Sequence, residues 1–165
     1  METVYLALGS NVGDSVKNIE LAIDYLAPKL KVTQTAKLYA SKPVGYTDQP
    51  NFINTAVKAT TELSPSKLMK YVKEVEIKTG RVKRFRWGPR EIDIDIIFYG
   101  NKTVNLEGII IPHPRFAERD FVLKPLLDLD SSLLDPNTKR PLSVLLEDIK
   151  TENRSIIGFI ENNEN

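Results

Sequence analysis

The segment Arg81–Tyr99 joins a basic, aromatic loop to a strand-like run that carries two carboxylates. The loop contains no acid, and its cationic and aromatic residues are Arg81, Lys83, Arg84, Phe85, Arg86, Trp87 and Arg90. Arginine keeps its charge and binds phosphate through paired hydrogen bonds. In the run that follows, Asp93 and Asp95 lie two residues apart, so on a strand their side chains point to the same face. Because unpaired buried carboxylates are costly and Mg²⁺ prefers carboxylate and phosphate oxygens, the segment predicts phosphate bound through Mg²⁺.

The same alternation predicts which strand residues are buried. One face would carry Ile92, Ile94, Ile96 and Phe98, and the other would carry Asp93, Asp95, Ile97 and Tyr99. Same-face Cα atoms lie about 6.5–7 Å apart, so the two carboxylates can converge on two Mg²⁺ ions about 3.5–4 Å apart. The alternative is that each aspartate is only a surface charge on an exposed sheet face.

The rest of the chain offers weaker candidates. It contains neither a glycine-rich Walker loop nor a kinase catalytic loop, so a nucleotide site would be built from arginines and metal. The basic loop alternatively reads as a solvated loop or a nucleic-acid patch. Phe52 and Asn54 share a strand face that suits a flat heteroaromatic ligand or simple core packing. His113, the only histidine, lies between two prolines and is a candidate phosphate or ligand contact.

Composition limits the classes of protein. A chain of 165 residues with 41% hydrophobic and 27% charged residues is typical of one globular domain. The net charge of +1 gives no global field for nucleic acid or membranes. The absence of cysteine excludes disulfides and thiolate metal sites and fits a reducing, cytoplasmic location. The N-terminus does not have the pattern of a signal peptide, and no window reaches the ~18 apolar residues of a membrane span.

The order of predicted elements positions these residues. Strands are expected over residues 4–8, 32–39, 51–61 and 92–99, and helices after Asp14 or Ser15 and after Ser64-Pro65. Gly80 stands where a helix C-terminal glycine belongs. This β-α-β-β-α-β order predicts an α+β, ferredoxin-like fold, with an antiparallel sheet covered by two helices on one face.

The chain after Gly100 forms a C-terminal extension. We expect a short hairpin within residues 101–111, a proline-rich turn leading into a helix before Leu129, and a short helix near Leu142–Leu146. The last fifteen residues are polar around an apolar cluster, which either packs on the core or begins a further segment. Its members are Ile156, Ile157, Phe159 and Ile160.

Five motifs, in order, resemble those of the 6-hydroxymethyl-7,8-dihydropterin pyrophosphokinase family. They are G-S-N at 9–11, D-Q-P-x-F-x-N at 48–54, G-R-V at 80–82, R-W-G-P-R-x-I-D-I-D at 86–95 and P-H-P at 112–114. The resemblance runs from about residue 3 to residue 147. It implies transfer of the β,γ-diphosphate of ATP to the pterin hydroxymethyl group, with release of AMP, in tetrahydrofolate biosynthesis.

The resemblance also implies roles for residues. Asp93 and Asp95 would hold two Mg²⁺ ions, with Asp93 near the substrate and Asp95 catalytic together with Arg81 and Arg90. ATP would be bound by Glu76, Lys83, Arg84, Arg86, Trp87, Arg90, Ile96, His113 and Arg119. The pterin would be bound by Ser41, Pro43, Val44, Phe52, Asn54, Trp87 and Phe121, with Phe52 and Phe121 on its two faces.

Three departures from the family pattern qualify these roles. Phe52 replaces a frequent tyrosine, Pro114 replaces a frequent aromatic residue, and a shorter basic loop leaves open whether Lys83 or Arg84 is its second phosphate ligand. The implied domain is 1–150, with 151–165 a polar tail or linker. The implied partners are ATP and the reduced pterin, with no nucleic acid and no membrane, and fusion to or partnership with dihydropteroate synthase as in some members.

Two other classes share parts of this pattern. An RNA-recognition module has the same element order, but it would carry an aromatic-rich strand that this chain lacks, and the two aspartates would repel a nucleic-acid backbone. A nucleotide-sugar transferase with a D-x-D motif would need a larger α/β scaffold.

Overall fold

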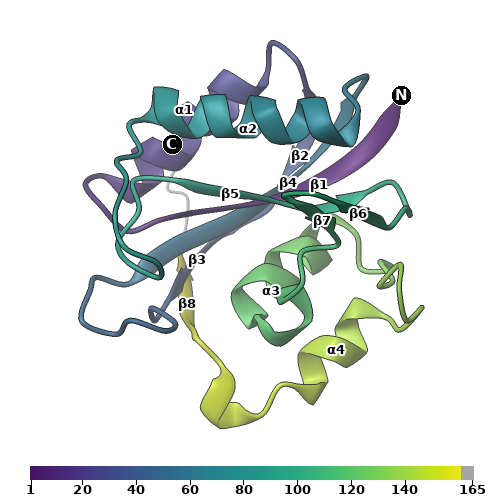
Figure 1. Cartoon of the computed structure of the whole chain (residues 1–165). Helices are drawn as coiled ribbons and strands as arrows, with labels where there is room; N and C mark the ends of the chain where they lie inside the picture. The colour runs from purple at the N-terminus through teal and green to yellow at the C-terminus, as the bar shows by residue number, and fades with distance from the viewer. Residues whose placement is uncertain (161–165) are drawn as a thin grey trace, which may run out of the picture.

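The computed structural model describes residues 1–160, in which six strands form one antiparallel sheet with helices on both faces (Figure 1). The strand order is β5-β1-β4-β3-β8, and β2 also pairs with β4. The strands are β1 (Glu2–Ser10), β2 (Lys31–Thr35), β3 (Leu38–Ser41), β4 (Phe52–Thr61), β5 (Asp93–Tyr99) and β8 (Ile156–Ile160). Because β1 lies between β5 and β4, and β2 and β3 lie beyond β4, the predicted ferredoxin-like arrangement is confirmed.

Two helices cover one face of the sheet, as predicted. α1 (Ser15–Leu26) is capped by Asp14, and α2 (Pro65–Thr79) is capped by Ser64 and begins with proline at its first position. Their apolar stripes pack on inward-facing sheet residues, and this core includes Val4, Leu6, Leu8, Ile19, Leu26, Val57, Leu68, Val72, Val75, Ile92, Ile94 and Ile96.

The predicted alternation of the last strand is correct as far as Ile97 and wrong for Phe98 and Tyr99. Leu6 of β1 pairs with Ile96, but the preceding Tyr5 pairs with Phe98, so the register shifts at this point and Ile97 is the extra residue. A β-bulge of this kind reverses the faces of the residues that follow it. Phe98 therefore packs on the opposite face to that expected, and Tyr99 returns to the core under α1 and α2.

The second face of the sheet is covered by the C-terminal helices. α3 (Asp120–Leu129) packs on the sheet, and α4 (Leu142–Asp148) packs against α3, in a second core that includes Tyr5, Ala56, Ile97 and Phe98. The short 3₁₀ turn η1 (Phe116–Glu118) adds Phe116, whose ring meets that of Phe98 edge to face at 5.3 Å. These helices lie below the sheet in Figure 1, whereas α1 and α2 lie above it.

The connecting segments differ in part from the sequence predictions. The hairpin expected within residues 101–111 is present as β6 (Val104–Leu106) and β7 (Ile109–Ile111). The single strand expected over residues 32–39 is instead two short strands, β2 and β3, separated by Ala36 and Lys37, and both pair with β4. No helix among residues 1–160 is long and apolar enough to cross a membrane.

The C-terminal apolar cluster forms a strand at the edge of the sheet, and its side chains do not join either core: Ile157 and Phe159 are exposed. After the 3₁₀ turn η2 (Thr151–Asn153), β8 pairs antiparallel with β3 and extends the main sheet by one strand. The division of the chain at residue 150 stays a prediction. The remainder of the predicted tail, residues 161–165, lies outside the described part of the chain.

Gly80 provides a test of the local design of α2. It ends the helix at φ 110° and its added Cβ would meet no atom within 4 Å, so replacement changes only backbone preference. We expect Gly80→Ala to lower the free energy of unfolding by about 1 kcal/mol, measured by urea denaturation. The control is Gly158→Ala, at a position that also has open space but no positive φ, and it should change stability by much less. Equal losses in the two variants would contradict the assignment.

Candidate active site

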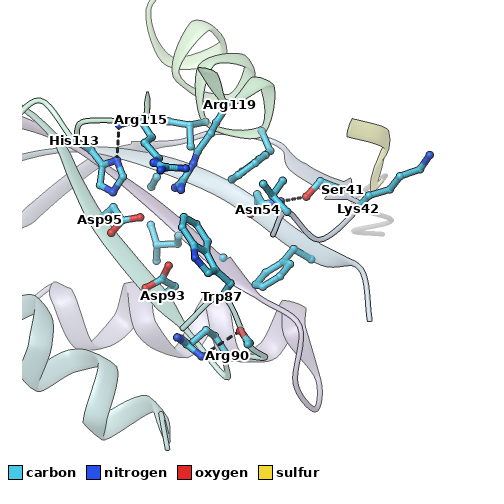
Figure 2. A pocket seen from close by; sticks show the side chains of 18 of the residues that line it. Ser41, Lys42, Asn54, Trp87, Arg90, Asp93, Asp95, His113, Arg115 and Arg119 are labelled. Carbon is cyan, nitrogen blue, oxygen red and sulfur yellow. Dashed lines mark hydrogen bonds between the residues drawn. The ribbon is translucent and has the colours of Figure 1, made fainter. Parts of the chain in front are cut away.

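A cavity of about 370 Å³ opens on the face of the sheet opposite α1 and α2, beside the start of α3 (Figure 2). Side chains from β1, β3, β4, β5 and α3 meet there with residues of the loops 42–51, 80–92 and 112–115. The lining residues are Ala7, Leu8, Gly9, Ser41, Lys42, Val44, Phe52, Asn54, Arg81, Arg86, Trp87, Gly88, Arg90, Asp93, Asp95, His113, Pro114, Arg115, Arg119, Phe121 and Val122.

Asp93 and Asp95 lie together on β5, as predicted (Figure 2). In the sheet they stand opposite Gly9 and Ala7 of β1, whose small side chains leave the carboxylates facing the cavity. A Cβ at Gly9 would lie 2.9 Å from Oδ1 of the buried Asn54, so a larger residue there would have to displace that side chain. Burial, with the neighbouring Asp93 charge second, raises the pKa of Asp95 to about 7.

This carboxylate pair fits the metal that the family resemblance implies. The charge of Asp93 disfavours the charged form of Asp95, and a cation bound by the two carboxylates would offset that cost. Among residues 1–160 no group of three or more His, Cys, Asp or Glu side chains forms a complete metal site. The chain therefore offers two carboxylates and leaves the other positions to substrate oxygens and water, which is how Mg²⁺ is commonly held.

Cationic side chains surround the ring of Trp87. The guanidinium carbons of Arg86, Arg115 and Arg119 lie 5.1, 5.3 and 5.6 Å from the ring centre. Arg119 is the most enclosed of them, and burial lowers its pKa below the usual arginine value. Burial and the charge of Arg119 also lower the pKa of His113, so its imidazole is neutral at pH 7. Arg86, Arg115 and Arg119 thus form a positively charged side of the cavity, the arginine wall.

Glu76 connects α2 to this site from behind β5. Glu76 is buried, at 1% exposed. Its carboxylate accepts a hydrogen bond from the Ile94 N–H at 2.9 Å and lies 2.8 Å from Nη1 of Arg81. The same Arg81 nitrogen lies 3.7 Å from Oδ1 of Asp93. Glu76 thus fixes the beginning of β5 and holds Arg81 beside the carboxylate pair.

Asn11 ties three loops together at the mouth of the cavity. Its side-chain amide donates to Oε1 of Gln49 at 2.9 Å and to the Pro50 carbonyl at 3.0 Å, and its Oδ1 accepts the Arg90 N–H at 2.8 Å. Gln49 in turn donates to the Trp87 carbonyl at 2.7 Å. The loops after β1, before β4 and before β5 are therefore joined through one buried amide.

Two loop arginines are held by the loop itself. Arg90 donates to the carbonyls of Phe85, Gly88 and Pro89, which organises the turn around Trp87. Arg84 forms two hydrogen bonds to Glu91, at 2.6 and 2.7 Å, and lowers the pKa of Glu91 to about 2. This pair occupies Arg84 outside the cavity.

A wall of different character lies at the other end of the cavity. Phe52 and Phe121 contribute aromatic surface, and Asn54 donates to the hydroxyl of Ser41 at 2.6 Å. Ser41 and Asn54 are both buried, at 1% and 6% exposed. Aromatic surface with a buried amide and hydroxyl suits a flat ring that carries hydrogen-bonding edges.

Most of the sequence-predicted site residues meet in this one cavity. Those lining it are Ser41, Val44, Phe52, Asn54, Arg81, Arg86, Trp87, Arg90, Asp93, Asp95, His113, Arg119 and Phe121. Pro43, Glu76, Lys83, Arg84 and Ile96 do not line it. Ile96 packs in the core under α1 and α2, because it alternates with Asp95, and Lys83 is exposed.

Sequence reasoning assigned no role to several residues of the site. Lys42 and Arg115 line the cavity, although Lys42 points outward in Figure 2, and Asn11 and Gln49 join the loops. Asn11, Gln49 and Arg115 stand within or next to the quoted motifs, and that position was the available indication. The loop-joining contacts of Asn11 and Gln49 span 38 or more residues in sequence and so could not be read from local pattern.

Comparisons with known proteins show the family of this chain. The family model for 7,8-dihydro-6-hydroxymethylpterin-pyrophosphokinase (HPPK) matches residues 5–131. A 2-amino-4-hydroxy-6-hydroxymethyldihydropteridine pyrophosphokinase of Aquifex aeolicus is 42% identical over 153 residues, covering 93% of each chain. The folic acid synthesis protein fol1 of Pneumocystis carinii is 44% identical over 165 residues, covering 99% of this chain and 22% of that protein.

The solved structures support the fold. A crystal structure of Plasmodium falciparum HPPK-DHPS superposes with a TM-score of 0.73 at 16% identity, covering 88% of this chain and 44% of the other. The chain thus spans less than half of some multidomain relatives and nearly all of others. Together, the matched motifs, the cavity and the relatives confirm the family resemblance: the chain belongs to the 7,8-dihydro-6-hydroxymethylpterin-pyrophosphokinase family.

Proposed function

We propose that this pyrophosphokinase transfers the β,γ-diphosphate of ATP to the hydroxymethyl oxygen of 6-hydroxymethyl-7,8-dihydropterin, with release of AMP, in tetrahydrofolate biosynthesis. The observation that carries the proposal is that one cavity joins a carboxylate pair and an arginine wall to an aromatic, amide-bearing wall. The first two suit a metal-bound triphosphate, and the third suits a pterin. The family match and the names of the relatives support this reaction.

The carboxylate pair is the proposed Mg²⁺ site. Asp93 and Asp95 would hold two ions, and their position opposite Ala7 and Gly9 supports this role because nothing larger covers them. Bound Mg²⁺ supplies Lewis-acid stabilisation of charge on the phosphate oxygens. Arg81 lies beside Asp93 and would limit the net charge of the pair when the triphosphate arrives.

The arginine wall would stabilise the charge that moves during transfer. As the hydroxymethyl oxygen bonds to the β-phosphorus and loses its proton, the bond from that phosphorus to the oxygen bridging to the α-phosphate breaks, and this oxygen leaves with AMP. Such transfers depend mainly on positioning and electrostatics. Arg86, Arg115, Arg119 and neutral His113 provide donors that need no protonation change at pH 7. Arg90 would join them on releasing the loop carbonyls.

The opposite wall would position the pterin. Phe52 and Phe121 would stack on its two faces, and Asn54, held by Ser41, would bond its polar edge. Val44 lines the same end of the cavity. Lys83 or Arg84 would reach phosphate only after movement of the basic loop, because neither lines the cavity and Arg84 is paired with Glu91.

We also propose how this domain is associated with other proteins and where it works in the cell. The HPPK-DHPS structures and the bifunctional relatives support a fusion to or partnership with dihydropteroate synthase. A cytoplasmic location without nucleic-acid or membrane partners fits a small-molecule enzyme with a net charge of +1.

The reaction is tested by its products. With ATP, Mg²⁺ and 6-hydroxymethyl-7,8-dihydropterin, we expect AMP and the pterin diphosphate in equal amounts, measured by ion-pair chromatography, because the transferred group is diphosphate. A reaction without pterin is the control and should yield no AMP. Formation of ADP, or of AMP without pterin, would overturn the proposed reaction.

Replacing one of the two carboxylates tests the metal assignment. Asp95→Asn should lower kcat at least about 100-fold, as expected when a group that stabilises the transition state is lost. The melting temperature should not fall, because burial and Asp93 already disfavour the charged carboxyl. Asp24→Asn, at an exposed site on α1, is the matched control. Wild-type turnover in Asp95→Asn would show that the metal site lies elsewhere.

The loop junction at Asn11 makes a separate prediction. Asn11→Ala removes three hydrogen bonds between loops, so kcat/KM for both substrates should fall about 100-fold through poorer closure of the site. Steady-state kinetics measure this loss. Asn18→Ala, which removes side-chain hydrogen bonds from α1 to Ser10 and Val12 in the segment just before it, is the control and should retain most activity. Similar losses in the two variants would argue against a closing role for Asn11.

A further inference from the structure

The last described strand lies against the substrate wall. β8 falls outside residues 5–131, the part matched by the family model, yet it pairs with β3 from Leu38 to Ser41. Without it, β3 would be held in the sheet only by the pairs of Tyr39, Ala40 and Ser41 with β4. In Figure 2 the ribbon of this C-terminal segment passes beside Ser41 and Lys42.

Two backbone links join this segment to the cavity wall. The Lys42 N–H donates to the Ser155 carbonyl at 2.9 Å, directly beyond the Ser41–Ile156 pair. Ser41 in turn accepts the hydrogen bond from Asn54. The position of the buried hydroxyl and amide therefore depends on where residues 155 and 156 lie.

Asp120 holds the segment from the other side. Asp120 is 3% exposed, and its Oδ2 accepts hydrogen bonds from the N–H groups of Ser155 at 2.9 Å and Ile156 at 3.0 Å. The other carboxylate oxygen, Oδ1, is buried without a hydrogen-bond partner among the described residues. Burying a charged group is costly unless it is well bonded, so this arrangement is an expensive way to fix a surface strand.

The position of Asp120 in the chain links that strand to the aromatic wall. It begins α3, and its sequence neighbours Arg119 and Phe121 both line the cavity. A continuous series of contacts thus runs from Phe121 through Asp120 and Ser155 to Ser41 and Asn54. Its two ends are the aromatic and polar sides of the proposed pterin site.

We propose that Ser155 and Ile156 brace the substrate site from outside the cavity and that Asp120 is a positioning residue, which sets the spacing between Phe121 and the Ser41–Asn54 pair. The inference rests on the proposed function. The strand that carries the two carboxylates is held by Glu76, and the Arg90 backbone is held by Asn11, through hydrogen bonds that do not involve Asp120. Loss of the Asp120 contacts should therefore weaken pterin binding and leave nucleotide binding unchanged.

Calorimetric titration of the full chain separates these effects. One titration uses Mg²⁺ with α,β-methylene-ATP, and the other uses 6-hydroxymethylpterin in the presence of that nucleotide. Asp120→Ala should raise the Kd of the pterin about tenfold and change the nucleotide Kd less than about twofold. Asp120→Asn should bind the pterin like wild type, because one amide oxygen can accept both N–H groups.

Two further variants keep the inference open to refutation. Asp135→Ala removes a buried carboxylate that accepts from Asn137 and Thr138 in a turn that does not line the cavity, and it controls for lost stability. If Asp120→Ala does not fold, Ser155→Pro deletes one of the two donors. Arg154, at φ −83° and ψ 136°, already has a conformation that a following proline accepts. Ser155→Pro should likewise raise the pterin Kd.

Three results of these titrations would contradict the role of Asp120. Unchanged pterin binding in Asp120→Ala, equal weakening of both ligands, or the same pterin loss in Asp135→Ala would overturn the positioning role. Failure of the wild-type chain to bind the pterin would overturn the proposed function and this inference with it.

Discussion

Asp93 and Asp95 place two like charges on a strand whose opposite face is packed with isoleucines, and this arrangement depends on register. Ile92, Ile94 and Ile96 are at most 3% exposed in the core under α1 and α2. A slip of one residue would turn both carboxylates into that apolar core, at a large cost in desolvation. Burial of the isoleucines therefore keeps the carboxylates directed at the cavity. The raised pKa of Asp95 is the electrostatic consequence of that constraint.

The remaining charges of the site are arranged around this pair through backbone anchors. Glu76 holds Arg81 and the first part of β5, and Asn11 fixes the backbone of Arg90 to two other loops. Trp87 adopts φ 65°, which is unfavourable for a residue with a Cβ, and its carbonyl is held by Gln49. Its ring lies among three guanidinium groups. The strained turn thus delivers an aromatic platform and an arginine cluster to the same cavity.

The two faces of the sheet serve different purposes. The face under α1 and α2 is continuous apolar core. The opposite face is shared, because α3 and α4 cover the half around Tyr5, Ala56 and Phe98, and the half near Asp93, Asp95 and Asn54 is left for ligand. The bulge at Ile97 separates the two uses by turning both Ile97 and Phe98 toward α3 and away from the α1/α2 core. The start of α3 belongs to both, since Val122 lies in the second core and also lines the cavity.

Local patterns were sufficient for the elements that carry their own periodicity and caps. The sequence determined α1 and α2 with Asp14, Ser64 and Gly80 at their ends, the shared face of Asp93 and Asp95, and, through its motifs, the family and most of the residues that meet in the cavity. Tertiary structure alone decided the faces of Phe98 and Tyr99, because a bulge is set by pairing with β1. It also decided the splitting of residues 31–41 into two strands, the pairing of Arg84 with Glu91, the Asn11 junction and the place of β8 beside Asp120. Several of these contacts join residues that are far apart in the chain, and their energies depend on burial and geometry that no local sequence pattern contains.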